Sequence, residues 1–335
     1  MIVTNSLTGG GAERSMNLVC NELDRRGWEV SLVPINSSAE DQVIPICEIF
    51  PLRRQWKGGV VSTFLAYIKF NQIVRTWKPD VIVLNCDLPE LFGALTFGRK
   101  CLVVLEHASV PWGHRPLLGR AVRQILALRK TTWAAVSTHL NVWPTSKKPY
   151  AVLDNPIVPI SNIQAIVSQD KIKRLVFIGR LSSEKRPELA LEIARISATE
   201  LIVIGDGDLL GSLKRKVAEE SISAQFVGRV NNPWLELVSG DVLIVTSSSE
   251  GDGLVVIEGL QHGIPMLLVD IPDFRRFNFP DENYCSDLDD FISRINNFTN
   301  NPSPLQVPSI LAEKILSGRS LKVVGDKWEE FLNSF

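Results

Sequence analysis

Short runs of β-branched and other apolar residues recur along the chain, with amphipathic stretches between them. Such runs are typical of the buried strands of parallel sheets, whose two faces are both covered by helices. One series of runs is 2–4, 30–33, 81–84, 102–105 and 134–137. A second series is 175–178, 201–204, 225–227, 242–245 and 266–269. The alternation predicts two α/β domains, each built on a doubly wound, Rossmann-like parallel sheet.

A proline-containing segment, 154–159, separates the two series. Its prolines lack backbone donors and bias the preceding residues away from helix, so we place the interdomain linker there. The predicted domains are 1–155 and 156–319. The remaining segment, 320–335, is expected to form a helix over 327–335 that crosses back to the first domain.

Composition narrows the class of protein. With 335 residues, 45% hydrophobic and 22% charged, the chain fits two globular domains rather than a disordered or fibrous protein. No stretch reaches the ~20 apolar residues of a membrane span, and no export signal precedes the first strand, so we expect a soluble, cytoplasmic protein. The five cysteines are scattered, which favours free thiols over disulfides or a zinc site.

The charge is divided unevenly along the chain. Residues 1–155 hold 18 Lys and Arg against 12 Asp and Glu, whereas the rest holds 18 against 25. A basic first half can concentrate anionic partners such as phospholipid head groups, and a solvated surface is the alternative. No nucleic acid partner is expected.

Glycines 9–11 follow the first strand and precede a helical pattern of apolar residues at positions 16, 19, 20 and 23. A backbone without Cβ atoms, next to the free amides of a helix start, suits a phosphate or sugar, so Gly10 and Gly11 are candidate contacts. The dinucleotide fingerprint GxGxxG would need glycine at Arg14, and a second match at 205–207 fails at Leu210. NAD or FAD is therefore disfavoured, and no cofactor is predicted.

Two cations follow the strand 175–178. Arg180 and Lys185 lie on a loop at the carboxyl edge of the predicted sheet, before a helix that Pro187 opens. Together they can hold a diphosphate and offset the charge that develops on a phosphate leaving group. Val227, at the end of its own strand, is a further candidate for ligand contact.

Two glutamates flank the start of a later helix. Glu250 precedes Gly251 and Gly253, the helix begins near Leu254, and Glu258 lies just over one turn inside it. Both carboxylates can then face one crevice. A carboxylate accepts hydrogen bonds from two hydroxyls at once, as a ribose diol or a sugar offers.

These motifs resemble those of glycosyltransferase family 4, over nearly the whole length. The glycine segment resembles that family's N-terminal glycine loop, Arg180 and Lys185 its diphosphate-binding pair, and Glu250 with Glu258 its E-x7-E motif; GIP at 263–265 resembles the GxP that follows. The resemblance implies the GT-B fold, with two Rossmann-like domains facing a central cleft.

The resemblance also implies roles for individual residues. Glu250 would contact hydroxyls of the donor sugar, Glu258 the ribose, and the backbone of Gly251, Gly253 and Leu254 the sugar and diphosphate. His107, after the strand 102–105, best matches a histidine that such enzymes place at the donor sugar. The other three histidines are interpreted as structural, and His262 as a charge that complements a helix C-terminus.

Two features depart from the pattern or compete with it. Asp252 stands where the family carries an apolar residue, which adds a negative charge near the expected diphosphate. The string Asp206-Gly207-Asp208 is a DxD sequence, but we interpret it as a turn in which Gly207 supplies permissive backbone geometry. No metal site is predicted.

The acceptor signals lie in the first domain. Residues 117–130 form a basic amphipathic pattern with Arg115, Arg120, Arg123, Arg129 and Lys130, and 53–57 is a basic, aromatic loop. Either can lie on an anionic membrane, so peripheral contact with the inner face of the cell membrane is one hypothesis. A helix packed on its own sheet is the alternative.

The function that follows is a retaining, metal-independent transfer of sugar from a nucleotide-diphosphate sugar, such as a UDP-sugar. The acceptor would be a hydroxyl of a saccharide or lipid-linked molecule, in the synthesis of a cell-surface polysaccharide, lipopolysaccharide or glycolipid. His107, Glu250, Arg180 and Lys185 would be the catalytic residues. A non-catalytic partner that regulates a transferase at the membrane, or a sugar-nucleotide epimerase of the same fold, are the alternatives.

Overall fold

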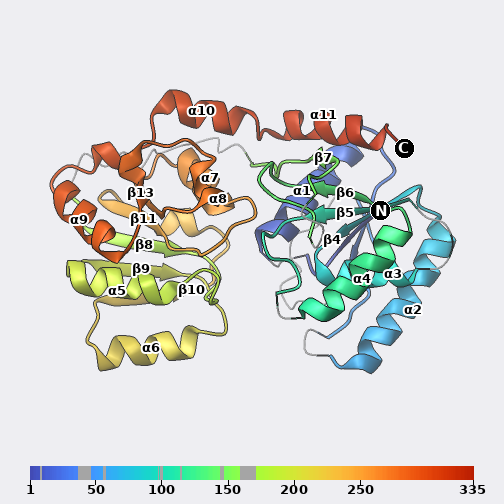
Figure 1. Cartoon of the computed structure of the whole chain (residues 1–335), viewed down its shortest axis with the longest axis horizontal. Coiled ribbons are helices and arrows are strands. Elements are labelled where there is room, and N and C mark those ends of the chain that lie inside the picture. The colour runs from blue at the N-terminus through green and yellow to red at the C-terminus, as the bar shows by residue number, and fades with distance from the viewer. Residues whose placement is uncertain are drawn as a thin grey trace. The chain divides into compact units, whose positions relative to one another are not determined.

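The computed structural model describes residues 1–7, 10–36, 47–55, 58–96, 98, 101–113, 115–143, 147–158 and 171–335. The chain divides into two compact units. Unit 1 is Met1–Val158 with Gly318–Phe335, and unit 2 is Pro159–Ser317. Each unit contains one parallel sheet with helices on it (Figure 1), which confirms the predicted fold class of two parallel α/β domains.

The sheet of unit 1 has the order β3-β2-β1-β4-β5-β6-β7, with every strand pair parallel. Its strands are β1 (Ile2–Thr4), β2 (Ser31–Pro34), β3 (Glu48–Ile49), β4 (Val81–Asn85), β5 (Cys101–Glu106), β6 (Thr132–Ala135) and β7 (Ala151–Val152). The sequence pattern did not predict β3 and β7, because these two-residue edge strands are too short to show a period.

Two hydrophobic clusters cover the two faces of this sheet. Along β5, Val103 and Leu105 belong to one cluster while Leu102 and Val104 belong to the other, as the two-residue period of a strand requires. The helices of the unit are α1 (Gly11–Arg25), α2 (Val60–Trp77), α3 (Asp87–Leu95), α4 (Pro116–Leu128) and α11 (Leu321–Leu332). Helices α1 and α11 pack on the first face, and α2, α3 and α4 on the second.

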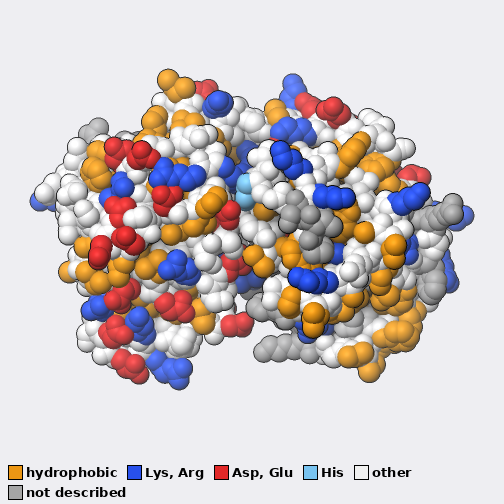
Figure 2. Space-filling model, viewed as in Figure 1, with side chains coloured by type: hydrophobic (Ala, Val, Ile, Leu, Met, Phe, Trp, Pro, Cys, Tyr) orange, Lys and Arg blue, Asp and Glu red, His pale blue; other side chains and the backbone are white. Residues whose placement is uncertain are grey.

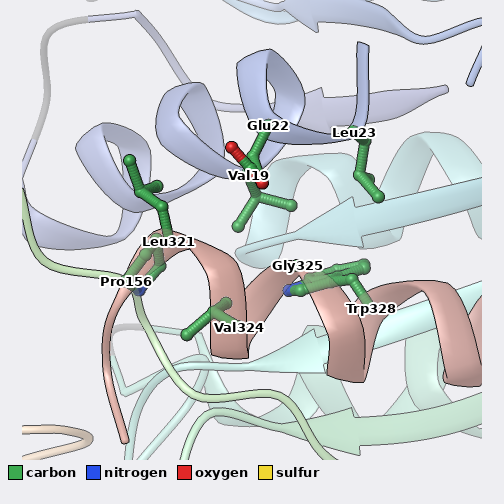
Figure 3. Close-up of a pocket in the computed structure, with 8 residues that line it drawn as sticks. All are labelled: Val19, Glu22, Leu23, Pro156, Leu321, Val324, Gly325 and Trp328. Carbon is green, nitrogen blue, oxygen red and sulfur yellow. The ribbon is translucent and has the colours of Figure 1, made fainter. Parts of the chain in front are cut away.

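The last helix, α11, packs on α1 (Figure 3). It begins at Leu321 rather than at the predicted Lys327, because the Ser320 hydroxyl caps its first turn. Figure 3 shows Val324, Gly325 and Trp328 of α11 facing side chains of α1 across a narrow crevice lined mostly by apolar groups. This crevice belongs to unit 1 alone and contains none of the candidate site residues.

The sheet of unit 2 has the order β10-β9-β8-β11-β12-β13, again all parallel. Its strands are β8 (Arg174–Ile178), β9 (Glu200–Ile204), β10 (Ala224–Gly228), β11 (Asp241–Val245), β12 (Met266–Val269) and β13 (Tyr284–Cys285). Its helices are α5 (Pro187–Ser197), α6 (Leu210–Glu219), α7 (Leu254–Gln261), α8 (Pro272–Arg275), α9 (Leu288–Phe298) and α10 (Ser309–Ser317), with 3-10 turns η1 (Pro233–Glu236), η2 (Asp281–Asn283) and η3 (Ser303–Leu305).

The strand order of unit 2 reverses between β8 and β11. From β8 the chain continues outward to β9 and β10, and from β11 it continues outward in the opposite direction to β12 and β13. The loops that leave these two central strands therefore run in opposite directions, and in open α/β sheets ligands bind outside the carboxyl ends of the strands at such a point. Within the part of the chain that the structure describes, no helix is both long and apolar enough to cross a lipid bilayer.

Candidate functional site

An ion pair joins the two loops that leave the strand-order reversal of unit 2. Lys185, after β8, places its Nζ atom 2.5 Å from Oε1 of Glu250, after β11. The Ser247 hydroxyl donates to the same carboxylate oxygen at 2.9 Å. The Lys185 side chain is 25% exposed and that of Glu250 10%, so the pair is partly accessible from outside rather than enclosed in the core. Two predicted site residues far apart in sequence thus meet.

Backbone and hydroxyl contacts fix these two loops to each other. The Thr246 hydroxyl donates to the carbonyl oxygens of Lys185 and Arg186, at 2.8 and 3.0 Å. The Ser248 amide donates to the Glu184 carbonyl at 2.8 Å. The position of Lys185 relative to Glu250 is therefore set by the main chain on both sides. Arg180 lies exposed on the same loop as Lys185, and Val227 is half-buried at the end of β10.

Helix α8 and the residue after it hold the loop that precedes α7. The Glu250 amide donates to Oδ2 of Asp273 at 2.6 Å. The Arg276 guanidinium contacts Oδ1 of Asp252 at 3.1 Å and donates to the Asp252 carbonyl. Gly253, the residue before α7, has φ 61°, which strains any side chain there.

The charge of Asp252 is therefore compensated within the protein. Asp252 is only 5% exposed, and the Arg276 guanidinium beside it supplies the opposite charge. The expectation that Asp252 adds a negative charge to the diphosphate site is wrong for this reason. The sequence motif did not identify Arg276, because it lies in a different element and has no fixed spacing from Glu250.

Glu258, on α7, is fixed by an aromatic residue that the sequence did not single out. The Trp234 indole N–H, on η1, donates to Oε2 of Glu258 at 3.1 Å. The Trp234 ring stacks on His262, with 4.8 Å between ring centroids. Burial lowers the pKa of His262, which disfavours the charged form at this helix C-terminus. The stacking on Trp234 is the contact that the structure gives the ring.

Close backbone contact explains the glycines after β9. A Cβ atom at Gly205 would lie 1.9 Å from the Gly179 carbonyl oxygen, and one at Gly207 would lie 2.4 Å from that of Leu181. Gly207 is thus required by space, and the predicted conformational reason for it is wrong. The Asp206 carboxylate accepts the Gly207 amide at 2.7 Å. In the described ranges no three His, Cys, Asp or Glu side chains are grouped to hold a metal ion.

The first-domain candidates lie at the carboxyl edge of the unit 1 sheet. Gly10 precedes α1 and Gly11 begins it, and the Gly10 amide donates to Oε2 of Glu13 at 2.7 Å. His107 is half-buried directly after β5. His139 contacts the Ser137 hydroxyl at 2.7 Å. Four residues that the sequence analysis named, Gly9, Trp56, Lys57 and His114, lie outside the described residues.

A buried ionic cluster includes Glu106, the residue that precedes His107. We call its members, Arg123, Glu90, Glu106 and Trp112, the Arg123 cluster. The Arg123 guanidinium bridges the carboxylates of Glu90, at 2.5 Å, and Glu106, at 2.6 Å. The Trp112 indole donates to Glu90 at 2.8 Å. Arg123 is 1% exposed, so its predicted place on the basic surface of a membrane helix is wrong. It faces the sheet, because two carboxylates there compensate the cost of burying its charge.

The Arg123 cluster gives a prediction for the pH dependence of stability. Burial raises the pKa of Glu106 to about 7, although Arg123 opposes the rise. The folded state therefore keeps a proton that the unfolded state loses near pH 4.5, and this contribution to stability disappears as the pH rises through 7. In the unmodified protein this group should lower the free energy of unfolding by about 1–3 kcal/mol between pH 5 and pH 8, and Glu106→Gln should remove that decrease. Urea unfolding at several pH values measures it, and parallel profiles for both proteins would contradict it.

Comparisons with known proteins cover both units. Residues 160–308 match the family model described as Glycosyl transferases group 1, and residues 9–142 match the model described as Glycosyltransferase Family 4. The chain is 24% identical to an uncharacterized glycosyltransferase of Haemophilus influenzae, over 79% of this chain and 78% of the relative. These matches agree with the resemblance that the motifs indicated.

Two further comparisons concern proteins with more detailed names. The chain is 26% identical, over 76% of its length and 74% of the relative, to a Campylobacter jejuni α-1,4-N-acetyl-D-galactosaminyltransferase named for the acceptor GalNAc-α-(1→4)-GalNAc-α-(1→3)-diNAcBac-PP-undecaprenol. The crystal structure of Anabaena HepE, in complex with UDP and glucose, superposes with a TM-score of 0.80 at 16% identity, covering 100% of this chain and 99% of HepE. The structural likeness shows the fold.

Proposed function

Since the chain belongs to the glycosyltransferase family 4 type and has the GT-B fold, we propose that it transfers a sugar from a nucleotide-diphosphate sugar to an acceptor hydroxyl, with retention of configuration. The observation that carries the proposal is the Lys185–Glu250 ion pair at the strand-order reversal of unit 2. In open α/β sheets this is the place where ligands bind. Lys185 can pair with a phosphate and Glu250 can accept hydrogen bonds from hydroxyls, and the two side chains are in contact there.

The donor would lie outside the carboxyl ends of the unit 2 strands. Arg180 and Lys185 would neutralise the diphosphate, and the amides at the start of α7, from Gly251 to Leu254, would donate to it. Glu250 would accept hydrogen bonds from the sugar and Glu258 from the ribose. The Trp234 indole, which donates to Oε2 of Glu258, would hold that carboxylate in place.

Charge neutralisation by these groups supplies the chemistry that the transfer needs. As the bond between the sugar and the diphosphate breaks, negative charge grows on the leaving oxygen, and preorganised cations and amides stabilise it without reorganising. The proposal therefore requires no metal ion. We assign no covalent nucleophile, and we propose His107 as a further catalytic residue.

The acceptor would be a saccharide carried on a lipid. The Campylobacter jejuni relative is named for an undecaprenol-linked acceptor, which supports this class. A lipid-linked acceptor would bring the enzyme to a membrane surface, with the pathway being the synthesis of a cell-surface polysaccharide. UDP is the nucleotide we propose for the donor, because HepE binds UDP and glucose in a chain of the same fold.

Donor binding provides the test of this proposal. UDP and UDP-sugars should raise the melting temperature of the protein, because a ligand that binds only the folded state stabilises it by about 2.7 kcal/mol at 100 times its Kd. Arg180→Ala and Glu258→Ala should each raise the Kd by about 10–100-fold, since each removes hydrogen bonds to a charged group. Titration calorimetry with UDP measures the change.

Matched variants on α6 separate a lost contact from a general loss of charge. Arg215 and Glu219 are exposed there, so Arg215→Ala and Glu219→Ala should bind UDP as the unmodified protein does. No shift with any UDP-, GDP- or ADP-sugar would favour a non-catalytic partner protein instead. Conversion of the donor sugar without an acceptor would favour an epimerase.

A further inference from the structure

The outer face of helix α2 is apolar and exposed over its first turns. Val60 and Val61 are 86% and 73% exposed, and Phe64, Leu65 and Ile68 follow on the same side of the helix. Their spacing places them in one stripe, opposite the residues that α2 buries against the sheet, Ala66, Phe70 and Val74. Scattered exposed apolar residues are normal, but a contiguous stripe marks an interaction surface.

Helix α4 carries a similar exposed face. Leu117 and Leu128 are 82% and 85% exposed, and Leu118 and Ile125 are also exposed. Helix α3 lies between α2 and α4 on the same face of the sheet: the Tyr67 hydroxyl of α2 donates to the Leu95 carbonyl, and Arg129, after α4, donates to the Thr96 carbonyl. Leu95 itself is 48% exposed. The three helices form one surface, which we call the α2–α4 face.

Basic residues outnumber acidic ones on the α2–α4 face. Helices α2 and α4 contain no Asp or Glu, whereas α3 contains Asp87, which is half-buried, and Glu90, which is buried in the Arg123 cluster. Exposed basic residues on these helices include Lys69, Arg75, Arg120 and Lys130. In Figure 2 hydrophobic side chains gather over α2 at the lower right of the view, with Lys and Arg beside them.

Arg54 and Arg115 extend the basic character to the starts of both helices. Arg54 precedes α2 and donates to the Thr63 hydroxyl within it, whereas Arg115 precedes α4. Burial, and then the charge of Arg115, lower the pKa of Arg54. Arg54 follows β3 and Arg115 follows β5, so both lie toward the carboxyl edge of the sheet that also carries His107.

We infer that the α2–α4 face is a docking surface for an anionic lipid bilayer, with Val60, Val61, Phe64, Leu65 and Ile68 entering the boundary between head groups and acyl chains. Apolar side chains beside basic ones, with no Asp or Glu in α2 or α4, complement a negatively charged surface that has an apolar interior. A second copy of the chain is a poorer occupant, because a two-fold interface would place each basic region against itself.

This inference deepens the proposed function, because it names where the enzyme would meet a lipid-linked acceptor. The sequence pattern indicates a basic surface at residues 53–57 and 117–130 but does not indicate α2. The apolar pattern of α2 is that of a helix packed on both sides, and only the structure shows which residues are left uncovered.

Binding to vesicles of defined composition tests the inference. The full-length protein should co-float with vesicles of phosphatidylcholine and phosphatidylglycerol and not with phosphatidylcholine alone, and binding should weaken as salt is raised. Phe64→Gln with Leu65→Gln should reduce the partition coefficient at least tenfold, since it removes buried apolar area. Lys69→Glu with Arg120→Glu should reduce it similarly.

Matched controls come from unit 2. Leu235 and Ile310 are as exposed as the α2 residues, at 79% and 83%, so Leu235→Gln with Ile310→Gln should leave vesicle binding unchanged. The inference would be overturned if the α2 variant and the unit 2 control lost vesicle binding equally, or if the unmodified protein did not bind anionic vesicles. In either case, dimers that form as the protein concentration rises would identify a second copy of the chain as the occupant.

The donor-binding assay separates this inference from the proposed function. The Phe64→Gln, Leu65→Gln protein should keep the melting-temperature shift with UDP, because no residue assigned to donor binding is changed. Vesicle binding without any nucleotide shift would defeat the proposed function and leave the docking surface standing. A melting-temperature shift with UDP but no vesicle binding would support the proposed function and defeat the docking surface.

Discussion

Arg123→Met is expected to lower the free energy of unfolding by about 3–5 kcal/mol, because it removes one partner of a buried ion pair and leaves charge behind. Arg123 is 1% exposed, and its guanidinium lies between two carboxylates that are themselves buried. Methionine keeps an unbranched apolar side chain, though a shorter one, and offers neither Glu90 nor Glu106 a donor. Urea unfolding at pH 8, where Glu106 is ionised, should show the full loss.

The same change should cost less at pH 5.5. Without Arg123, the pKa of Glu106 would rise further, and protonation would neutralise one of the two carboxylates. Arg120, one turn away on the same helix and exposed, is the matched control: Arg120→Met should change stability by no more than about 0.5 kcal/mol.

A combined variant tests whether the cost arises from unpaired charge. Arg123→Met with Glu90→Gln and Glu106→Gln should be less destabilised than Arg123→Met alone, because the carboxylates left without a partner are also gone. If the three changes instead add up, the residues contribute independently and the account of the Arg123 cluster is wrong. His107 directly follows Glu106, so donor turnover by these variants would also report how far the cluster positions that histidine.

Regular periodicity explains why much of the fold could be predicted. Each central strand is a run of apolar residues long enough to stand out in the sequence, as in β4 (Val81–Asn85) and β11 (Asp241–Val245). Where the period is absent, prediction failed: β3, β7 and β13 have two residues each. The helix α11 starts earlier than expected, because a serine cap rather than an apolar residue marks its beginning.

The candidate site could be predicted where a motif holds its residues at fixed spacing. Glu250 and Glu258 belong to one motif, and the structure places them before and within α7. Contacts between distant segments leave no such trace: Trp234 meets Glu258 and Arg276 meets Asp252 only because the loops of unit 2 converge. Arg123 was misassigned for a related reason, since its helical position does not reveal the carboxylates that face it.

Lys185→Ala is expected to have the largest effect on activity, with a loss in kcat of about 10²–10³-fold, the size typical of removing one preorganised group that stabilises developing charge. Two consequences follow from one change. The diphosphate loses a cation on the leaving group, and Glu250, whose Oε1 lies 2.5 Å from Lys185 Nζ, loses its ion-pair partner. The Ser247 hydroxyl, at 2.9 Å, would still donate to that oxygen.

The rate of UDP release from the donor, with a lipid-linked saccharide as acceptor, measures the effect. Lys171→Ala removes an exposed lysine of the same unit and should leave the rate unchanged. Lys185→Arg keeps the charge but not its compact shape, so its rate should fall between those of the alanine variant and the unmodified protein. A Lys185→Ala protein that melts normally and turns over within a few-fold of the original rate would show that the Lys185–Glu250 pair is structural, because a cation on the leaving diphosphate cannot be lost without slowing its departure.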